Sequence, residues 1–175
     1  AALRSGAGLV TVATPASCLP IVASLGAAYM TIPLEELPDG TVASGALERV
    51  LSAPHDVIAA GPGLGTGPAQ EAFVRGLLVR AATPLVLDAD ALSVLAPDPD
   101  ALRGTPDRPV VITPHPGEMA RLLGARAAQI QRDRLGAARS FATGHHLYVV
   151  LKGSRTLIAS PDGTVYINPT GNPGM

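Results

Sequence analysis

The sequence predicts an α/β fold in which helices on both faces cover a mostly parallel central sheet. Short apolar runs without alternation, such as DVIAAG and PLVLDAD, indicate strands that are covered on both faces. Longer segments rich in Ala and Leu separate these runs, and this alternation favours parallel strands joined by right-handed crossovers. After Gly153 the pattern changes: RTLIAS and VYIN flank the turn PDGT and predict a C-terminal β-hairpin.

The individual elements follow in chain order from these patterns. We expect strands over residues 9–14, 56–61, 84–90, 109–113 and 147–153. The predicted helices cover residues 16–25, 68–79 and 91–95, followed by helical segments up to about residue 142. The first of these helices is entered through Pro15. No internal repeat or long linker interrupts the chain, so we expect a single domain over residues 1–175.

The composition fits a compact globular domain rather than a disordered or fibrous chain. The 175 residues are 47% hydrophobic and 15% charged, with a formal net charge of −1. There is no Trp and aromatic residues reach 3%, so a nucleic-acid partner is not expected. No apolar run approaches the roughly 18 residues of a membrane span. The single Cys18 excludes an internal disulfide, fits the reducing cytoplasm, and is expected to be a buried small hydrophobe rather than a nucleophile.

Glycines gather where the second predicted strand ends, and the carboxyl ends of strands are where open α/β sheets bind ligands. The motif GPGLGTG, residues 61–67, precedes a helix. Its glycines allow the backbone to approach a ligand and to turn N–H groups toward an anion. It is neither a P-loop nor a dinucleotide fingerprint, because the lysine and the glycine spacing are wrong. A plain turn and a ligand contact both stay open for this loop.

Two aspartates flank the end of the third predicted strand, in LDADAL. We expect Asp90 to cap the N-terminus of the helix that begins at Ala91. Asp88 is the candidate for contact with a Mg²⁺-bound phosphate, directly or through water. The alternative for Asp88 is that it ties down a neighbouring loop.

A histidine between two prolines follows the fourth predicted strand, in VITPHPGEMARLLG. Pro114 and Pro116 restrict the backbone on both sides of His115 and predict an extended segment. Glu118 falls in the first turn of the next helix, where a negative charge suits the helix dipole. We expect this rigidity to aim the imidazole into the crevice for a hydrogen bond to a polar substrate. The alternative is a ring that is satisfied by a neighbouring carbonyl.

Lys152 directly follows the fifth predicted strand. Gly153 leaves room beside it, and the next residues, SRT, add hydrogen-bond donors. Such a turn suits the phosphate or ribose of a nucleotide. The alternative is a solvated lysine at the mouth of a hairpin.

Taken together, five blocks resemble the ADP/ATP-dependent NAD(P)H-hydrate dehydratase family: GPGLG, VLDADAL, ITPHPGEMARLLG, VVLKGSRTLI and GTVYINPTGNPGM. This family is the C-terminal domain type of bifunctional nicotinamide nucleotide repair proteins and has a ribokinase-like fold. ALRSGAGLVTVATP resembles its first recognisable segment, so the resemblance covers almost the whole chain. It implies that the ring hydroxyl of an NADH or NADPH hydrate is phosphorylated and that phosphate is then eliminated. It also implies Mg²⁺, ADP in bacterial-type members or ATP in eukaryotic ones, and a homo-oligomer, commonly a tetramer.

The resemblance also assigns roles to particular residues. Gly63 and Gly65 match the loop that contacts the hydrate, and His115 matches the substrate-binding histidine. The residues that match the nucleotide-binding segment are Lys152, Gly153, Ser154, Arg155 and Thr156. No direct metal ligand is implied, and no catalytic residue falls within the chain, because the family's catalytic Asp lies in a GSGD-type segment beyond Met175.

The chain departs from the family pattern at both ends. It stops before the GSGD-type segment, and the family's opening helix is missing before Ala1, so we expect an incomplete domain that has little or no dehydratase activity as written. One alternative function is a ribokinase-like small-molecule kinase of the hydroxymethylpyrimidine or thiazole type, which PHPGE and NPGM disfavour. The other is a non-catalytic nucleotide-binding fragment.

Overall fold

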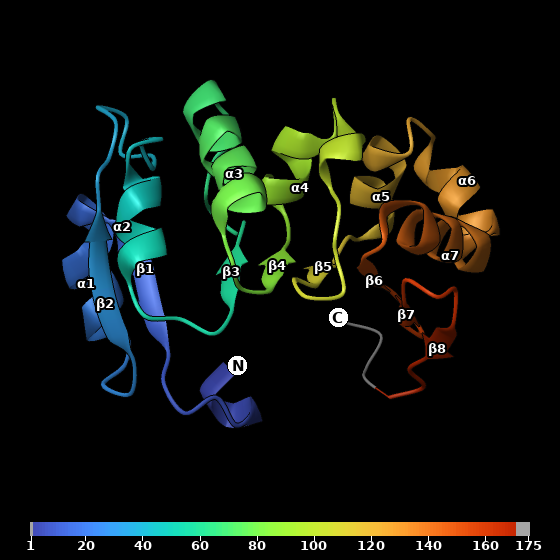
Figure 1. The fold of residues 1–175 in the computed structure, drawn as a ribbon, viewed down its shortest axis with the longest axis horizontal. Helices are drawn as coiled ribbons and strands as arrows, with labels where there is room; N and C mark the ends of the chain where they lie inside the picture. The colour runs from blue at the N-terminus through green and yellow to red at the C-terminus, as the bar shows by residue number, and fades with distance from the viewer. Residues whose placement is uncertain (1, 171–175) are drawn as a thin grey trace. The chain divides into compact units, whose positions relative to one another are not determined.

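The computed structural model describes residues 2–170. Its contacts divide the chain into two compact units, Ala1–Ala53 and Pro54–Met175, and the strand-end motifs fall in the second unit (Figure 1). One domain over the whole chain stays a prediction. The NPGM block, residues 172–175, lies outside the described residues. None of the helices within residues 2–170 combines the length and the apolar character that a bilayer crossing requires.

The first unit is built around two parallel strands, in which Thr11 pairs with Met30. Its elements, in chain order, are a 3-10 helix (Ala2–Ser5), β1 (Thr11–Pro15), a 3-10 helix (Ala16–Cys18), α1 (Leu19–Ser24), β2 (Met30–Leu34) and α2 (Ala46–Ser52). The helical turns that follow Pro15 confirm the helix expected there. The sequence patterns miss β2, because Pro33 within it lacks a backbone donor and argues against a strand.

Two predictions of burial in the first unit are wrong. The apolar run LVTVAT, residues 9–14, has the same unalternating pattern and predicts a covered strand. In β1, however, only Thr14 is buried, and Leu9 just before the strand is 81% exposed. Cys18 was expected to be buried and is partly exposed, with its Sγ 3.9 Å from the Ser17 hydroxyl. An apolar run without alternation therefore does not indicate burial in this part of the chain.

The second unit is a six-stranded sheet with four parallel strands followed by two antiparallel ones, in the order β3-β4-β5-β6-β7-β8. Its strands are β3 (Ile58–Ala60), β4 (Leu85–Leu87), β5 (Val110–Ile112), β6 (Tyr148–Leu151), β7 (Leu157–Ala159) and β8 (Val165–Ile167). Its helices are α3 (Pro68–Arg80), α4 (Asp90–Leu95), a 3-10 helix (Pro99–Ala101), α5 (Pro116–Leu122), α6 (Ala127–Arg132) and α7 (Arg134–His145). This arrangement confirms the predicted alternation, the mostly parallel sheet and the C-terminal hairpin.

Helix α3 shows how the local sequence sets these elements. It begins after Gly67, whose N–H donates to Oε1 of Gln70 at 3.0 Å. Pro68 occupies the first turn, where no N–H is needed for the helix. Val74 and Leu77 are both 0% exposed, and such burial contributes roughly 1.5–3 kcal/mol for each side chain.

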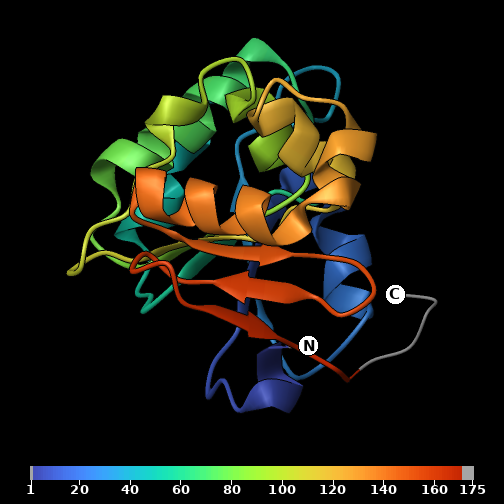
Figure 2. The same cartoon turned by 90° about the vertical axis from the view of Figure 1, so that its right-hand side faces the viewer.

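The core of the second unit lies between the sheet and its helices. Helices α3 to α7 lie over one face of the sheet, and α7 packs across β6 and β7 (Figures 1 and 2). Within the described part of the second unit, helices therefore cover one face of the sheet rather than the two faces expected from the sequence. The strand side chains that are 0% exposed are Leu85, Leu87, Val110, Ile112, Val149, Leu151 and Ala159. Alternate residues such as Val86 and Val111 point to the other face and are half-buried. This packing fixes the strand ends from which the candidate site is built.

Candidate functional site

The ends of the parallel strands bring the motifs of the second unit to one edge of the sheet. Lys152, which follows β6, joins two of these motifs. Its Nζ lies 2.7 Å from Oδ1 of Asp88 and 3.8 Å from Oε2 of Glu118. Its backbone N–H donates to the carbonyl of Pro114 at 2.8 Å. Asp88, Glu118 and Lys152 therefore form one charged cluster.

The charged cluster is open on its lysine side. The side chains of Lys152 and Asp88 are 41% and 28% exposed, whereas that of Glu118 is only 6% exposed. A buried carboxylate needs partners, and Glu118 has the ammonium group of Lys152 and the backbone N–H of His115. An exposed ammonium group beside these carboxylates is suited to contact the phosphate of an incoming ligand.

His115 caps helix α5 instead of being satisfied by a carbonyl. Its Nδ1 accepts hydrogen bonds from the N–H groups of Gly117 at 2.9 Å and of Glu118 at 3.3 Å. Oε2 of Glu118 accepts in return from the backbone N–H of His115 at 2.7 Å, which completes a capping box. Because Nδ1 is the acceptor, the neutral ring carries its proton on Nε2.

The other ring nitrogen of His115, Nε2, is therefore a hydrogen-bond donor. Nε2 lies 3.4 Å from Oε1 of Glu118, and the side chain is 51% exposed. Gly117 is required for this arrangement, since a Cβ there would lie 2.8 Å from Cε1 of His115. The rigidity expected from Pro114 and Pro116 thus combines with the cap to hold the ring in one orientation.

The glycine loop depends on backbone shapes that favour glycine. Gly61, Gly63 and Gly65 have φ of 142°, 75° and 90°. A Cβ on Gly61 would lie 1.8 Å from the carbonyl oxygen of Asp88, so the loop passes against the end of β4. At Gly63 nothing lies within 4 Å of the Cβ position. Of the two glycines assigned to the hydrate, Gly63 therefore faces open space.

The capping role predicted for Asp90 is wrong. Helix α4 begins at Asp90 itself, and the residue before it is Ala89, whose φ of 50° is unusual for a residue with a side chain. Oδ2 of Asp90 accepts a hydrogen bond from the N–H of Gly65 at 2.9 Å. Asp88 instead accepts from the N–H of Ala89 at 2.9 Å. Asp90 thus anchors the glycine loop, a contact across the sequence that no local pattern indicates.

The turn after β6, residues 152–156, is held by hydrogen bonds from Arg134, a residue that the sequence patterns also miss. Arg134, the first residue of α7, donates to the carbonyl oxygens of Leu151, Lys152 and Ser154. Within the turn, Oγ1 of Thr156 donates to the carbonyl of Gly153 at 3.1 Å. Lys152 to Thr156, assigned to the nucleotide, are therefore one ordered turn beside the charged cluster.

The site offers oxygens for a magnesium ion but not a complete set of ligands. No group of three or more His, Cys, Asp or Glu side chains within residues 2–170 is arranged to hold a metal ion. Asp88 and Glu118 provide carboxylates of the kind Mg²⁺ prefers, but both lie near the ammonium group of Lys152. The residues present thus fit a Mg²⁺ that is carried by the phosphates of a nucleotide.

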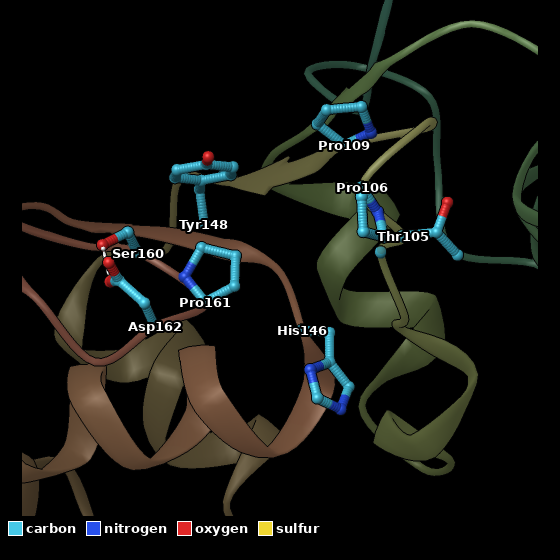
Figure 3. A pocket seen from close by; sticks show the side chains of 9 residues that line it. Thr105, Pro106, Pro109, His146, Tyr148, Ser160, Pro161 and Asp162 are labelled. Carbon is cyan, nitrogen blue, oxygen red and sulfur yellow. Dashed lines mark hydrogen bonds between the residues drawn. The ribbon is translucent and has the colours of Figure 1, made fainter.

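A cavity of about 590 Å³ lies elsewhere in the second unit (Figure 3). Its lining includes Pro106, Pro109, His146, Tyr148, Pro161 and Asp162. Pro109 precedes β5 and Tyr148 opens β6, so the cavity faces the amino ends of these strands and not the charged cluster. A hydrogen bond from the Ser160 hydroxyl lowers the pKa of Asp162. None of the motif residues line this cavity. The candidate site is therefore the charged cluster with its neighbouring loops, and not the cavity.

Comparisons with known sequences identify one family over the whole chain. The sequence model of a family described as NAD(P)H-hydrate dehydratase matches residues 1–175. A bifunctional NAD(P)H-hydrate repair enzyme of Moorella thermoacetica is 52% identical over 177 residues. An ADP-dependent (S)-NAD(P)H-hydrate dehydratase of Bacillus subtilis is 34% identical over 177 residues. These alignments cover 100% and 98% of this chain but only 33% and 57% of the two relatives.

Solved structures agree with the sequence comparison. An ADP/ATP-dependent NAD(P)H-hydrate dehydratase from Bacillus subtilis, co-crystallized with ATP/Mg²⁺ and soaked with CoA, matches with a TM-score of 0.74 and 33% identity. The match covers 98% of the present chain and 58% of the Bacillus subtilis chain. A ribokinase-like superfamily protein from Enterococcus faecalis matches with a TM-score of 0.73 and 27% identity, over 99% of this chain and 57% of its own. These likenesses confirm the ribokinase-like fold, and the relatives' names favour a dehydratase over a small-molecule kinase.

Proposed function

The chain belongs to the NAD(P)H-hydrate dehydratase family, and on this basis we propose that the complete protein carrying this sequence dehydrates the hydrate of NADH or NADPH with ADP as phosphate donor. The ring hydroxyl loses its proton to a base of the complete protein and its oxygen bonds to the β-phosphorus of ADP. The bond between that phosphorus and the bridging oxygen breaks, and AMP leaves. The phosphate group then leaves with its electron pair while the neighbouring ring carbon loses a proton, which restores the double bond. Phosphate leaves far more readily than hydroxide, so the transfer step makes the dehydration feasible.

The observation that carries this proposal is the hydrogen bond from the N–H of Lys152 to the carbonyl of Pro114, at 2.8 Å. It joins the turn proposed to bind the nucleotide to the residue directly before His115, which is proposed to bind the hydrate. Phosphoryl transfer requires both reactants to be held side by side in one orientation. A direct backbone link between the two binding segments supports this function better than either segment does alone.

We propose distinct roles for the two segments. The residues that bind ADP are Lys152, Gly153, Ser154, Arg155 and Thr156. The ammonium group of Lys152 donates a hydrogen bond to a phosphate oxygen and is held in place by Asp88. Nε2–H of His115 donates a hydrogen bond to a polar oxygen of the hydrate, and Gly63 and Gly65 give the ring a close approach to the loop. These roles are binding and orientation, and we assign no proton abstraction to these residues.

Magnesium enters this proposal as part of the ADP complex. Bound Mg²⁺ supplies charge neutralisation at the phosphates, as in other phosphoryl transfers. Asp88 is the proposed protein contact for this ion or its phosphate, directly or through water. For the complete protein we further propose a cytoplasmic location, supported by the single cysteine among these 175 residues, and a homotetramer, supported by the family resemblance.

The experiment that tests the function is recovery of NADH from its purified hydrate by the complete protein. We expect recovery with ADP and Mg²⁺, with release of AMP and phosphate in equal amounts. Accumulation of a phosphorylated small molecule, with no NADH formed, would support the kinase alternative. Binding of ADP without any turnover would support a non-catalytic nucleotide-binding protein.

A further inference from the structure

The turn after β6 is held by an arginine that lies outside it. Nη1 of Arg134 donates to the carbonyl of Ser154 at 2.6 Å, and Nη2 donates to the carbonyls of Leu151 at 3.1 Å and Lys152 at 3.3 Å. The Nε of Arg134 is buried and has no hydrogen-bond partner among residues 2–170. The hydrogen bonds of the guanidinium group therefore all go to three backbone carbonyls of a single turn.

These contacts determine where the backbone N–H groups of the turn point. In a planar trans peptide the carbonyl and the N–H point in opposite directions. The carbonyl of Leu151 faces Arg134, and the N–H of the same peptide, at Lys152, accordingly faces away and donates to Pro114 at 2.8 Å. By the same rule, the N–H groups of Gly153 and Arg155 face away from Arg134.

The N–H groups of Gly153 and Arg155 are available to a ligand. Neither has a hydrogen-bond partner in the described part of the chain, and both residues have a positive φ, 135° and 54°. Two backbone N–H groups of one turn that point to the same side form a donor surface that suits an anion. The charges of Lys152 and Arg155 in the same turn have the sign that a phosphate needs.

Gly153 is adapted to the arginine as well as to the turn. A Cβ at Gly153 would lie 3.1 Å from Nη2 and 3.4 Å from Cζ of Arg134. The glycine thus leaves the space in which the guanidinium group reaches the carbonyls. The structure explains this glycine by its φ of 135° and by its contact with Arg134, independently of any contact with a nucleotide.

We propose that Arg134 is a positioning residue for the nucleotide: it holds the carbonyls of the turn on its own side and so presents the N–H groups of Gly153 and Arg155 to a phosphate group of ADP. This inference rests on the proposed nucleotide-binding role of the turn. Lysine cannot replace the arginine, because a single ammonium group lacks the planar fork that reaches carbonyls at separate positions.

The test compares two arginines of the same helix in the complete protein. Arg134→Lys removes the fork, and Arg139→Lys is the matched control, because Nε of Arg139 donates to the carbonyl of Gly163 in the β7–β8 turn, at 3.1 Å. We expect Arg134→Lys to raise the KM and the Kd for ADP by about tenfold, equivalent to roughly 1.4 kcal/mol. We expect the KM for the hydrate to change by less than about twofold for both variants.

A second variant keeps the proposal testable if Arg134→Lys does not fold. Gly153→Ala inserts a methyl group against the guanidinium group and should weaken ADP binding in the same way. The two effects should add less than fully, because the variants share the contact with the guanidinium group, although alanine also strains the backbone at a φ of 135°. A purely structural role predicts instead a lower melting temperature with an unchanged Kd for ADP, and that result in both variants would overturn the proposal.

The outcomes separate this inference from the proposed function. If the wild-type protein binds ADP and Arg134→Lys behaves like Arg139→Lys, the positioning role is wrong while the function stands. If the wild-type protein binds no ADP at all by titration calorimetry, the nucleotide-binding role of the turn fails and the inference fails with it.

Discussion

Lys152 and Asp88 form an ion pair, with Nζ 2.7 Å from Oδ1, although 64 residues separate them in the sequence. The pair spans from the end of β6 to the end of β4, and β5 lies between these strands in the sheet. It holds an ammonium group at the edge where the glycine loop, His115 and the turn after β6 meet. A phosphate that approaches this edge therefore meets an ammonium hydrogen-bond donor whose position Asp88 already fixes.

Replacing this lysine should weaken nucleotide binding selectively. Lys152→Met in the complete protein should raise the Kd for ADP at least about tenfold, because a hydrogen bond to a charged group contributes roughly 1.5–3 kcal/mol. Titration calorimetry measures the effect. The control is Arg121→Met, an exposed cation on α5, which should leave the Kd unchanged. Equal losses in the two variants would show that only general surface charge is involved.

The two roles of His115 can be separated by choosing the replacement. His115→Asn should keep the helix cap, since asparagine is a favoured N-cap residue, and should stay within about 0.5 kcal/mol of the wild-type stability. It removes the Nε2 donor, so kcat/KM for the hydrate should fall by about tenfold or more. His115→Ala should lose the cap as well, at about 0.5–2 kcal/mol.

Urea unfolding and steady-state assays of both variants provide the comparison. Unchanged kinetics in a stable His115→Asn protein would limit this histidine to capping α5. A large loss of stability in His115→Asn would show that asparagine does not reproduce the cap, and the substrate role would then rest on the kinetics of His115→Ala corrected for folded fraction.

Asp90 should matter for the glycine loop rather than for helix α4. Asp90→Ala leaves the N–H of Gly65 without its acceptor, which costs about 1–3 kcal/mol of folding free energy if the group stays buried. The KM for the hydrate should rise at the same time, because the loop loses its anchor. Asp100→Ala is the control, since that carboxylate is 81% exposed and its ion pair with Arg103 at 3.8 Å contributes less than about 1 kcal/mol. Equal denaturation midpoints for the two variants would contradict the anchoring role.

The stability of the fold should fall in mild acid because of His145. Burial lowers the pKa of this ring, and this effect outweighs the hydrogen bond of Nδ1 to the carbonyl of Leu102, which raises the pKa. A histidine whose pKa is lower in the folded protein binds protons more readily when unfolded. Stability is therefore fully present above the unfolded value of about 6.5 and is lost as the pH falls below it.

Unfolding midpoints measured between neutral and mildly acidic pH test this linkage. His145→Gln should show a flatter pH dependence than the wild-type protein, although it also loses the stacking of the ring on Phe141 at 4.0 Å. An identical pH dependence in the two proteins would show that His145 does not account for the acid sensitivity.

Much of this fold could be predicted from local sequence patterns. The strands β3 to β8 and helix α3 follow from apolar runs, Pro68 and the turn at Asp162, all of which act over a few residues. Strand β2 could not be predicted, because Pro33 within it lacks a backbone donor and argues against a strand. Burial in the first unit could not be predicted either, since LVTVAT has the pattern of a covered strand and is largely exposed.

The site was predicted as a set of strand-end residues, but not as a set of contacts. The patterns indicated Asp88, His115 and Lys152, because these stand where strands end. They missed the roles of Asp90 and Arg134, whose partners lie 25 residues from Asp90 and 17 to 20 residues from Arg134. The sheet brings these partners together, and neither secondary-structure propensity nor spacing along the chain predicts such long-range contacts.

The most direct test of the central claim is the recovery of NADH from its hydrate by the complete protein, with ADP and Mg²⁺, in the wild type and in Lys152→Met. The account predicts NADH and AMP in equal amounts from the wild type. It predicts that the variant needs at least about tenfold more ADP for the same rate. The account would be contradicted if the folded wild-type protein formed no NADH and instead used ADP to phosphorylate another alcohol.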